Sequence, residues 1–291
     1  MVNHSQNIVH QPVPHDSSAG HVSGSAKYTD DIPVPESTLV ILIGQSTQAH
    51  ALINSIDLTA VEQSDGVVAV LSAENIPGIN DCSPVAGDDP VFAEDKVMYY
   101  GQSLFAVVAK DMVSARNAAS LAKIQYDPKP AILTIDEAMN ARAFLGPPAV
   151  IQSGDPDYTI TKTEHQISGR IEIGGQEHFY LEAQAAVAIP GENGDVQIFC
   201  SSQHPSEIQH KVAEVLGLSN HSVTVETRRM GGAFGGKESQ GNLPAVVAAL
   251  AAQITGCPAK ITYDRDDDFM LTGKRHDFRI DYHVGFDNKG V

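Results

Sequence analysis

Cysteine is scarce in this sequence. Its 291 residues include three cysteines, Cys82, Cys200 and Cys257, which are widely separated and odd in number. This pattern argues against a disulfide framework and against a cysteine-ligated zinc or iron–sulfur site. Scattered free thiols suit a reducing compartment, so we expect a cytoplasmic protein.

Basic residues are also few. Lysine and arginine number 19 against 36 aspartates and glutamates, which gives a net charge of −17. Such a charge would repel nucleic acid and anionic membranes, so we expect neither as a partner. No run approaches the roughly 20 apolar residues of a membrane span, and residues 1–6 lack the basic and apolar parts of a secretory signal. With 42% hydrophobic residues, the composition is that of a soluble globular protein.

The chain is long enough for two domains, and its turn signals divide it into four parts. Residues 1–18 form a polar N-terminal tail, and residues 19–130 form a first domain whose strands and helices close within that span. Residues 131–157, rich in proline and glycine, are a linker with one short helix over 135–141. Residues 158–291 form a second domain. The mixture of strands and helices predicts an α+β fold.

Alternation and capping signals predict the individual elements. In the first domain they are strands over 39–43, 51–56 and 67–71, a hairpin-like pair over 97–108 and a helix over 115–123. In the second they are strands over 167–173, 185–189, 196–200 and 278–286, and helices over 206–216 and 243–255. We expect Ser206 and Gln209 to form a capping box and Asn242 to be the N-cap of the last helix.

The last residues predict a turn. Asp287–Gly290 follows the strand over 278–286, so a returning strand would start at Val291, where the sequence stops. We therefore expect these 291 residues to be the N-terminal part of a longer chain, with the second domain truncated at its C-terminal end.

The run from Arg228 to Glu238, RRMGGAFGGKE, is the most informative part of the sequence. Its glycines let the backbone take positive φ and approach a ligand closely. A predicted strand around Val223–Val225 precedes it, and the helix over 243–255 follows. A glycine loop between a strand and a helix aims backbone N–H groups at an anion or an oxo group.

A nucleotide phosphate is the first candidate ligand. Gly231 to Lys237 fits the G-x-x-x-x-G-K part of a P-loop. The next position of a P-loop is Ser or Thr, which holds the magnesium ion, whereas here it is Glu238, which would repel phosphate. The residues argue against this interpretation and leave two others open, a glycine-rich turn without a ligand and a loop that binds a different group.

Five motifs resemble one known family. They are Gly174–Glu182 (GGQEHFYLE), Ser202–Glu207 (SQHPSE), the glycine loop, Tyr263–Asp268 (YDRDDD) and Thr272–Phe278 (TGKRHDF). In this order they resemble the molybdenum-binding subunit of bacterial xanthine dehydrogenases, within the xanthine dehydrogenase/aldehyde oxidase family of molybdenum hydroxylases. Upstream, Gly20 to about Tyr126 resembles that family's α/β-hammerhead domain, notably at Gly24–Asp31 and Gly101–Ser103. The resemblance implies a hammerhead domain followed by the first part of a molybdopterin-binding domain.

The resemblance assigns roles to five residues. Gln176 matches the glutamine whose amide contacts the molybdenum oxygen ligand, and an amide suits this role because it donates without adding charge. Phe234 matches the position whose backbone faces the molybdenum, and Gly232 and Gly235 let the main chain come close. These four are the expected cofactor-binding residues, with Gln176 and Phe234 nearest the metal. Glu238 matches the glutamate that orients the substrate. Taken alone, the same residues also fit a strand-end glutamine, a core aromatic and a solvated loop carboxylate.

The resemblance also implies a reaction in purine metabolism. Hypoxanthine and xanthine would be hydroxylated to urate with oxygen from water at the molybdenum–molybdopterin cofactor. Electrons would pass to a 2Fe-2S cluster and FAD on partner subunits and then to NAD, because this sequence has no cysteine pattern or flavin fingerprint for them. We therefore expect a hetero-oligomer. A general-base glutamate and a substrate arginine are expected beyond Val291, so the chain by itself should be inactive.

Two other functions stay open. The protein could be another molybdenum hydroxylase that acts on aldehydes or other N-heterocycles, although Glu238 argues against an aldehyde oxidase, in which that position tends to be apolar. It could also be a non-catalytic assembly module that binds partner subunits through the hammerhead domain.

Overall fold

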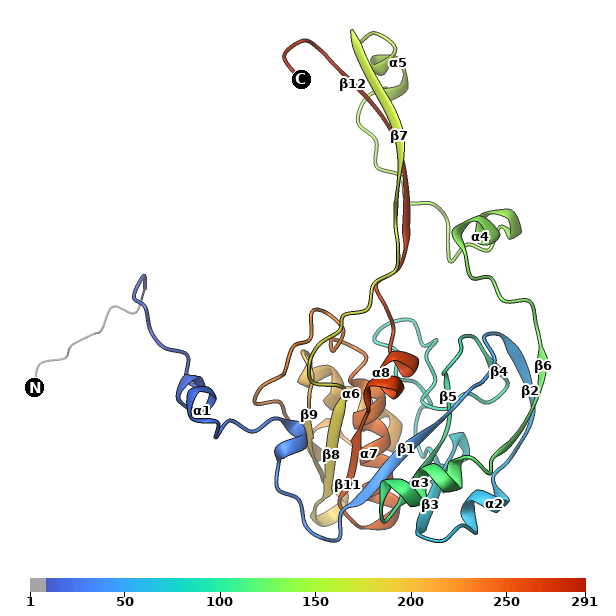
Figure 1. Ribbon diagram of the computed structural model, residues 1–291, viewed down its shortest axis with the longest axis vertical. Coiled ribbons are helices and arrows are strands. Elements are labelled where there is room, and N and C mark those ends of the chain that lie inside the picture. The colour runs from blue at the N-terminus through green and yellow to red at the C-terminus, as the bar shows by residue number, and fades with distance from the viewer. Residues whose placement is uncertain (1–8) are drawn as a thin grey trace, which may run out of the picture.

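The computed structural model describes residues 9–291, so part of the predicted tail, residues 1–8, lies outside the described residues (Figure 1). The main body is a mixed seven-stranded sheet with the order β10-β9-β8-β11-β1-β5-β3. Its strands are Val223–Glu226 (β10), Val196–Cys200 (β9), Ala185–Pro190 (β8), Ala259–Thr262 (β11), Leu39–Gln45 (β1), Ser103–Ala109 (β5) and Val67–Leu71 (β3).

Strand β1 joins the two halves of the chain. It pairs in parallel with β11, with Leu39 opposite Ala259, and antiparallel with β5, with Val40 opposite Ala109. A central strand is covered on both faces and needs apolar residues at successive positions, which Ile41–Ile43 supplies. The prediction that the elements of residues 19–130 close within that span is therefore wrong, because β1 forms part of its ladder with a strand far downstream.

Two helices cover one face of this sheet. In α6 (Pro205–Leu216) and α7 (Asn242–Thr255), the buried apolar side chains share one core with β1, β8, β9 and β11. Gly217 is the C-cap of α6, with a φ of 65°. The predicted capping box is wrong, because Gln209 donates instead to the carbonyl oxygens of Asn220 and Val223. Asn242 is not an N-cap either, since it lies inside α7 and its side chain binds other segments.

A smaller core lies on the other face of the sheet. It contains residues of α3 (Met112–Ala119), which lies against β1 and β5, of α2 (Thr59–Glu62), which lies against β3, and of a three-stranded sheet with the order β4-β2-β6. These strands are Lys96–Val97 (β4), Ala51–Asp57 (β2) and Lys123–Pro128 (β6). The predicted hairpin over 97–108 is wrong, because β4 and β5 belong to different sheets. The helix predicted over 115–123 starts earlier, where Asp111 caps it, and gives way to β6.

The remaining elements are short. They are α1 (Ser18–Ser23), α4 (Ile135–Ala141), α5 (Pro156–Ile160), α8 (Arg265–Leu271) and the 3₁₀ turns η1 (Thr29–Asp31), η2 (Ala73–Asn75), η3 (Glu192–Gly194) and η4 (Asn220–Ser222). The helix predicted over 135–141 is confirmed as α4. No helix within residues 9–291 is both long and apolar enough to cross a membrane.

A two-stranded ribbon projects from the body (Figure 1). It pairs β7 (His165–Ile173) with the predicted strand β12 (Phe278–Phe286) along their full length. One face is apolar and exposed, and its residues are Ile167, Ile171, Ile173, Phe278, Ile280, Tyr282 and Val284. The opposite face carries the ion pairs Arg170–Asp281 and Arg279–Glu172. Since two strands alone are marginally stable in water, this apolar face is typical of an interaction surface.

The segment around Gly78 packs closely on the end of α6. The Gly78 amide donates to the Val215 carbonyl oxygen at 2.9 Å, and a Cβ at position 78 would lie 2.0 Å from the Glu214 carbonyl oxygen. We expect Gly78→Ala to destabilise the protein by about 1–3 kcal/mol, because backbone atoms must move to admit the methyl group. Urea unfolding checks this against Gly146→Ala, whose new Cβ would meet no atom within 4 Å. Equal midpoints for the two variants would contradict the close packing at Gly78.

Candidate functional site

The glycine loop connects β10 to α7, so the predicted order of strand, loop and helix is confirmed. Gly232 and Gly235 have φ values of 96° and 91°. Phe234 has a φ of 55° although it is not glycine, and its side chain is 75% exposed. A bulky residue in this region of φ is an outlier that the surrounding structure must hold in place.

Hydrogen bonds from neighbouring segments fix the loop backbone. The Gly231 amide donates to Glu182 Oε2 at 2.7 Å, and the Gly235 amide donates to Gln203 Oε1 at 3.0 Å. Gln184 Nε2 donates to the Gly236 carbonyl oxygen at 3.0 Å. Side chains of three residues outside the loop, Glu182, Gln203 and Gln184, therefore hold its backbone in place.

Three consecutive amides in the middle of the loop are left free. Within residues 9–291, no group accepts a hydrogen bond from the backbone N–H of Gly232, Ala233 or Phe234. An unsatisfied N–H group needs water or a ligand as its partner. Successive N–H groups in a loop with positive φ form a concave site for an anion or an oxo group.

Lys237 is buried, and its ammonium group is bound by other residues of the protein. Its side chain is 0% exposed, and Nζ lies 2.6 Å from Ser201 Oγ, 3.2 Å from Glu182 Oε2 and 4.7 Å from the centre of the Tyr180 ring. Burial lowers the pKa of the Lys237 ammonium, and the Glu182 charge acts against this shift. A P-loop lysine must reach bound phosphate, so the structure excludes that role for Lys237.

The segment Gly174–Glu182 crosses over the loop. A Cβ at Gly231 would lie 2.5 Å from the Glu182 Cβ, and one at Gly236 would lie 2.6 Å from the His178 ring. Glycine is needed at both positions because the two backbones approach so closely. Gln176, two residues before His178, is held by a backbone bridge to Arg275, with both N–H···O distances at 3.0 Å.

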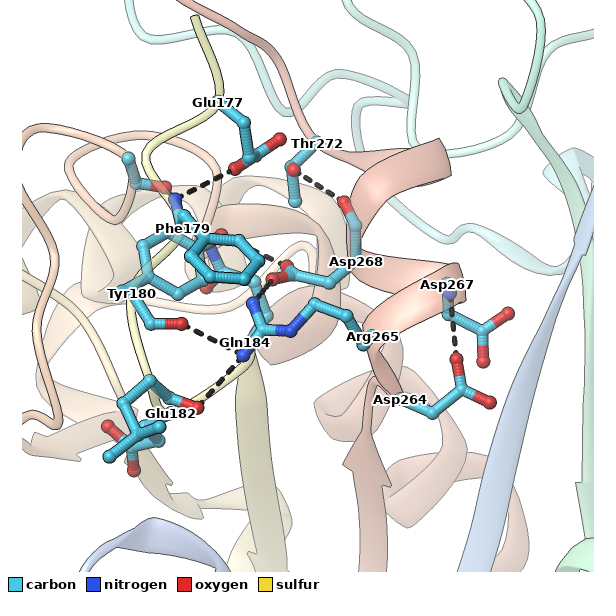
Figure 2. Close-up of polar contacts among 12 residues, drawn as sticks. Glu177, Phe179, Tyr180, Glu182, Gln184, Asp264, Arg265, Asp267, Asp268 and Thr272 are labelled. Atoms are coloured by element: carbon cyan, nitrogen blue, oxygen red, sulfur yellow. Dashed lines mark hydrogen bonds and ion pairs between the residues drawn. The ribbon is translucent and has the colours of Figure 1, made fainter.

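A buried polar network supports the loop from the side of α8 (Figure 2). Tyr180 Oη donates to Asp268 Oδ1 at 3.0 Å and accepts from Gln184 Nε2 at 3.1 Å, and the same Gln184 amide reaches the loop. Arg265 donates to the Tyr180 carbonyl oxygen at 2.8 Å and lies 3.3 Å from Asp268 Oδ2. Burial raises the pKa of Asp268. This network connects α8 to the loop through hydrogen-bonded side chains.

The structure brings the predicted site residues into one region. Gly232, Phe234, Gly235 and Glu238 lie on the loop, and the backbone of Gln176 lies on the segment that crosses it. The side chains of Gln176 and Glu238 are exposed, and neither forms a hydrogen bond within the described part of the chain. Both remain available to a ligand, and the roles assigned to these residues remain predictions.

The available donors are neutral. They comprise three backbone N–H groups and the Gln176 carboxamide, which suit an oxygen-rich cofactor or a metal oxo group rather than a bare metal ion. Among residues 9–291, no cluster of three or more His, Cys, Asp or Glu side chains could hold a metal ion. The donor set therefore fits a cofactor that brings its own metal ligands.

Sequence reasoning missed the residues that anchor the loop. Glu182, Gln184, Ser201 and Lys237 lie in or beside the motifs, but their contacts join segments up to 55 residues apart. No feature of the neighbouring sequence indicates that the Lys237 side chain is buried.

Comparison with known proteins identifies the class. Residues 23–130 match the family "Aldehyde oxidase and xanthine dehydrogenase, a/b hammerhead domain", and residues 139–291 match the family "Molybdopterin cofactor-binding domain". The fold is therefore a hammerhead domain followed by the start of a molybdopterin-binding domain. This chain belongs to the xanthine dehydrogenase/aldehyde oxidase family of molybdenum hydroxylases, which are oxidoreductases.

Individual relatives agree with this assignment. The chain is 40% identical over 287 residues to the xanthine dehydrogenase/oxidase of Mus musculus, covering 98% of this chain and 21% of that protein. It is 38% identical over 289 residues to aldehyde oxidase 1 of Bos taurus, covering 98% of this chain and 22% of that protein. The aldehyde oxidoreductase structure from Desulfovibrio gigas has the same fold, with a TM-score of 0.84 at 24% identity over 95% of this chain and 32% of that one. The chain spans about a fifth of the length of these curated relatives.

Proposed function

We propose that this chain forms part of the molybdenum-cofactor site of an enzyme that hydroxylates hypoxanthine and xanthine to urate with oxygen from water. The observation that carries the proposal is the row of three amides, Gly232 to Phe234, followed on the same loop by the Glu238 carboxylate, all without a hydrogen-bond partner among residues 9–291. The 40% identity to a xanthine dehydrogenase/oxidase supports the choice of substrate class.

The residues of this chain would bind and orient. The free amides of Gly232, Ala233 and Phe234 and the Gln176 carboxamide would donate hydrogen bonds to oxygen atoms of the cofactor. The molybdenum–molybdopterin group would supply the redox chemistry when bound. Glu238 would hydrogen-bond the purine ring and fix which carbon faces the cofactor. A hydrogen bond that strengthens as charge builds on the ring lowers the barrier to reaction.

A second candidate is oxidation of aldehydes or other N-heterocycles. The 38% identity to aldehyde oxidase 1 of Bos taurus, over an equal share of the chain, favours it. Glu238 is the feature that distinguishes the two candidates, because a carboxylate matches the hydrogen-bonding edge of a purine and has no counterpart in a simple aldehyde. We therefore place the purine substrate first.

The wider organisation is part of the same proposal. We propose domain limits at 19–130 and 158–291, joined by the linker 131–157, after an N-terminal tail over 1–18. The 2Fe-2S cluster, FAD and NAD would be bound by partner subunits in a cytoplasmic hetero-oligomer, and electrons would leave through them.

The test of the cofactor site is Gln176→Ala in the active enzyme that includes this chain. The substitution removes an exposed side chain, so the fold should persist, while molybdenum content, the molybdenum spectrum and turnover of xanthine should all be impaired. Gln63→Ala is the matched control. It removes an exposed glutamine at the C-terminal end of α2 and should change neither the molybdenum content, the spectrum nor the turnover. Unchanged molybdenum content, spectrum and turnover in Gln176→Ala would show that Gln176 lies outside the cofactor site.

A further inference from the structure

A single carboxylate oxygen ties the two ends of the glycine loop together. Glu182 Oε2 accepts from the Gly231 amide at 2.7 Å and from Ser201 Oγ at 2.7 Å, and it lies 3.2 Å from Lys237 Nζ. Gly231 begins the loop and Lys237 lies near its end. The free amides of Gly232 to Phe234 lie between these two anchored positions.

The burial of Lys237 is not explained by packing alone. Its side chain is 0% exposed and the Glu182 side chain is 13% exposed. Removing two charges from water is costly, and a buried ion pair contributes less to stability than an apolar side chain of similar volume would. What the ion pair provides is a fixed geometry, because the Lys237 ammonium must lie within hydrogen-bond distance of Ser201 and Glu182.

We infer that Lys237 and Glu182 are positioning residues that hold the loop backbone, and with it the free amides, in the geometry that receives the cofactor. The inference rests on the proposed function only for the identity of that ligand. Gln203 and Gln184 bind the backbone of the last part of the loop, whereas the Glu182 carboxylate contacts both the first part, at Gly231, and the Lys237 side chain of the last part.

Hydrogen–deuterium exchange of the 291-residue chain tests the anchoring without any cofactor. The variant Glu182→Gln/Lys237→Met removes both charges together, so neither is left buried alone. The amides of Gly235 and Gly236 are bonded to Gln203 and Ala233 rather than to the pair, so their exchange reports on the geometry of the loop. We expect their exchange to accelerate about 10- to 150-fold, the range for loss of a hydrogen bond to a charged group, while the amides of α7 stay unchanged.

The matched control is Asp81→Asn/Lys211→Met. Lys211 and Asp81 form another largely buried pair between distant segments, with Nζ 3.1 Å from Oδ2 and both side chains 13% exposed. Its removal should leave the exchange of Gly235 and Gly236 as in the wild type.

Three results would overturn the inference. They are unchanged exchange at Gly235 and Gly236 in the loop variant, an equal acceleration in α7, and failure of the loop variant to fold, since the last two would make the pair a general part of the core. If loop exchange accelerates as expected but the enzyme that includes this chain binds no molybdenum, the anchoring stands and the proposed function fails.

Discussion

Lys237→Met alone is expected to lower the free energy of unfolding by about 3–5 kcal/mol, the usual effect of breaking a buried ion pair on one side. The substitution leaves the Glu182 carboxylate buried without its cation, and Glu182 Oε1 already has no hydrogen-bond partner in the part of the chain that the structure describes. Urea unfolding of the chain, monitored by circular dichroism, measures the change. Glu182→Gln/Lys237→Met should be clearly more stable than the single variant, because it leaves no uncompensated charge.

An exposed ion pair provides the contrast. On the ribbon, Arg170 Nε lies 2.6 Å from Asp281 Oδ1, and the two side chains are 53% and 63% exposed. Arg170→Met should change the free energy of unfolding far less than Lys237→Met does, because solvent screens the pair. If Lys237→Met had an equally small effect, the ion pair would not hold the loop.

Local signals predicted the elements of this fold well. The glycine loop between β10 and α7, the helix α4 and the strand β12 were predicted because each depends on neighbours in the sequence, such as glycine spacing and the alternation of apolar residues. The resemblance then predicted the class of protein, since the order of the motifs is itself informative.

Pairing between distant segments could not be predicted in this way. Nothing around Leu39 indicates that its strand lies beside Ala259, because an apolar run is compatible with many partners. For the same reason the hairpin over 97–108 was wrong, since β4 and β5 separate into two sheets. The anchoring of the loop by Glu182 and Lys237 belongs to this class of contacts, and it appears only once the strands are placed.

The residues of the candidate site also differ in how far the sequence predicted them. The loop glycines were expected to allow positive φ, and the structure shows it at Gly232 and Gly235, which the resemblance assigned to the cofactor site. Gln176 and Glu238 were predicted from resemblance alone, and the structure shows only that their side chains are exposed and free of hydrogen bonds within residues 9–291. What those two side chains bind is a question of chemistry that substrate measurements answer.

Glu238→Ala is expected to reduce kcat/KM for xanthine and hypoxanthine by about 10- to 150-fold, the loss that corresponds to one hydrogen bond to a charged group. The same variant should oxidise a simple aldehyde almost as fast as the wild type, since an aldehyde offers no ring nitrogens or carbonyls for the carboxylate to orient. The physical reason is that Glu238 would act on the substrate, whereas the free amides beside it would act on the cofactor, which both substrates share.

The two substrates must therefore be compared in one preparation of the active enzyme, with kcat/KM divided by molybdenum content so that any loss of cofactor cancels. Glu192→Ala, which removes an exposed carboxylate from η3, controls for the change in net charge and should leave both rates unaltered. Equal losses on purine and aldehyde in Glu238→Ala would place Glu238 with the cofactor. Undiminished purine turnover would show that Glu238 does not orient the substrate.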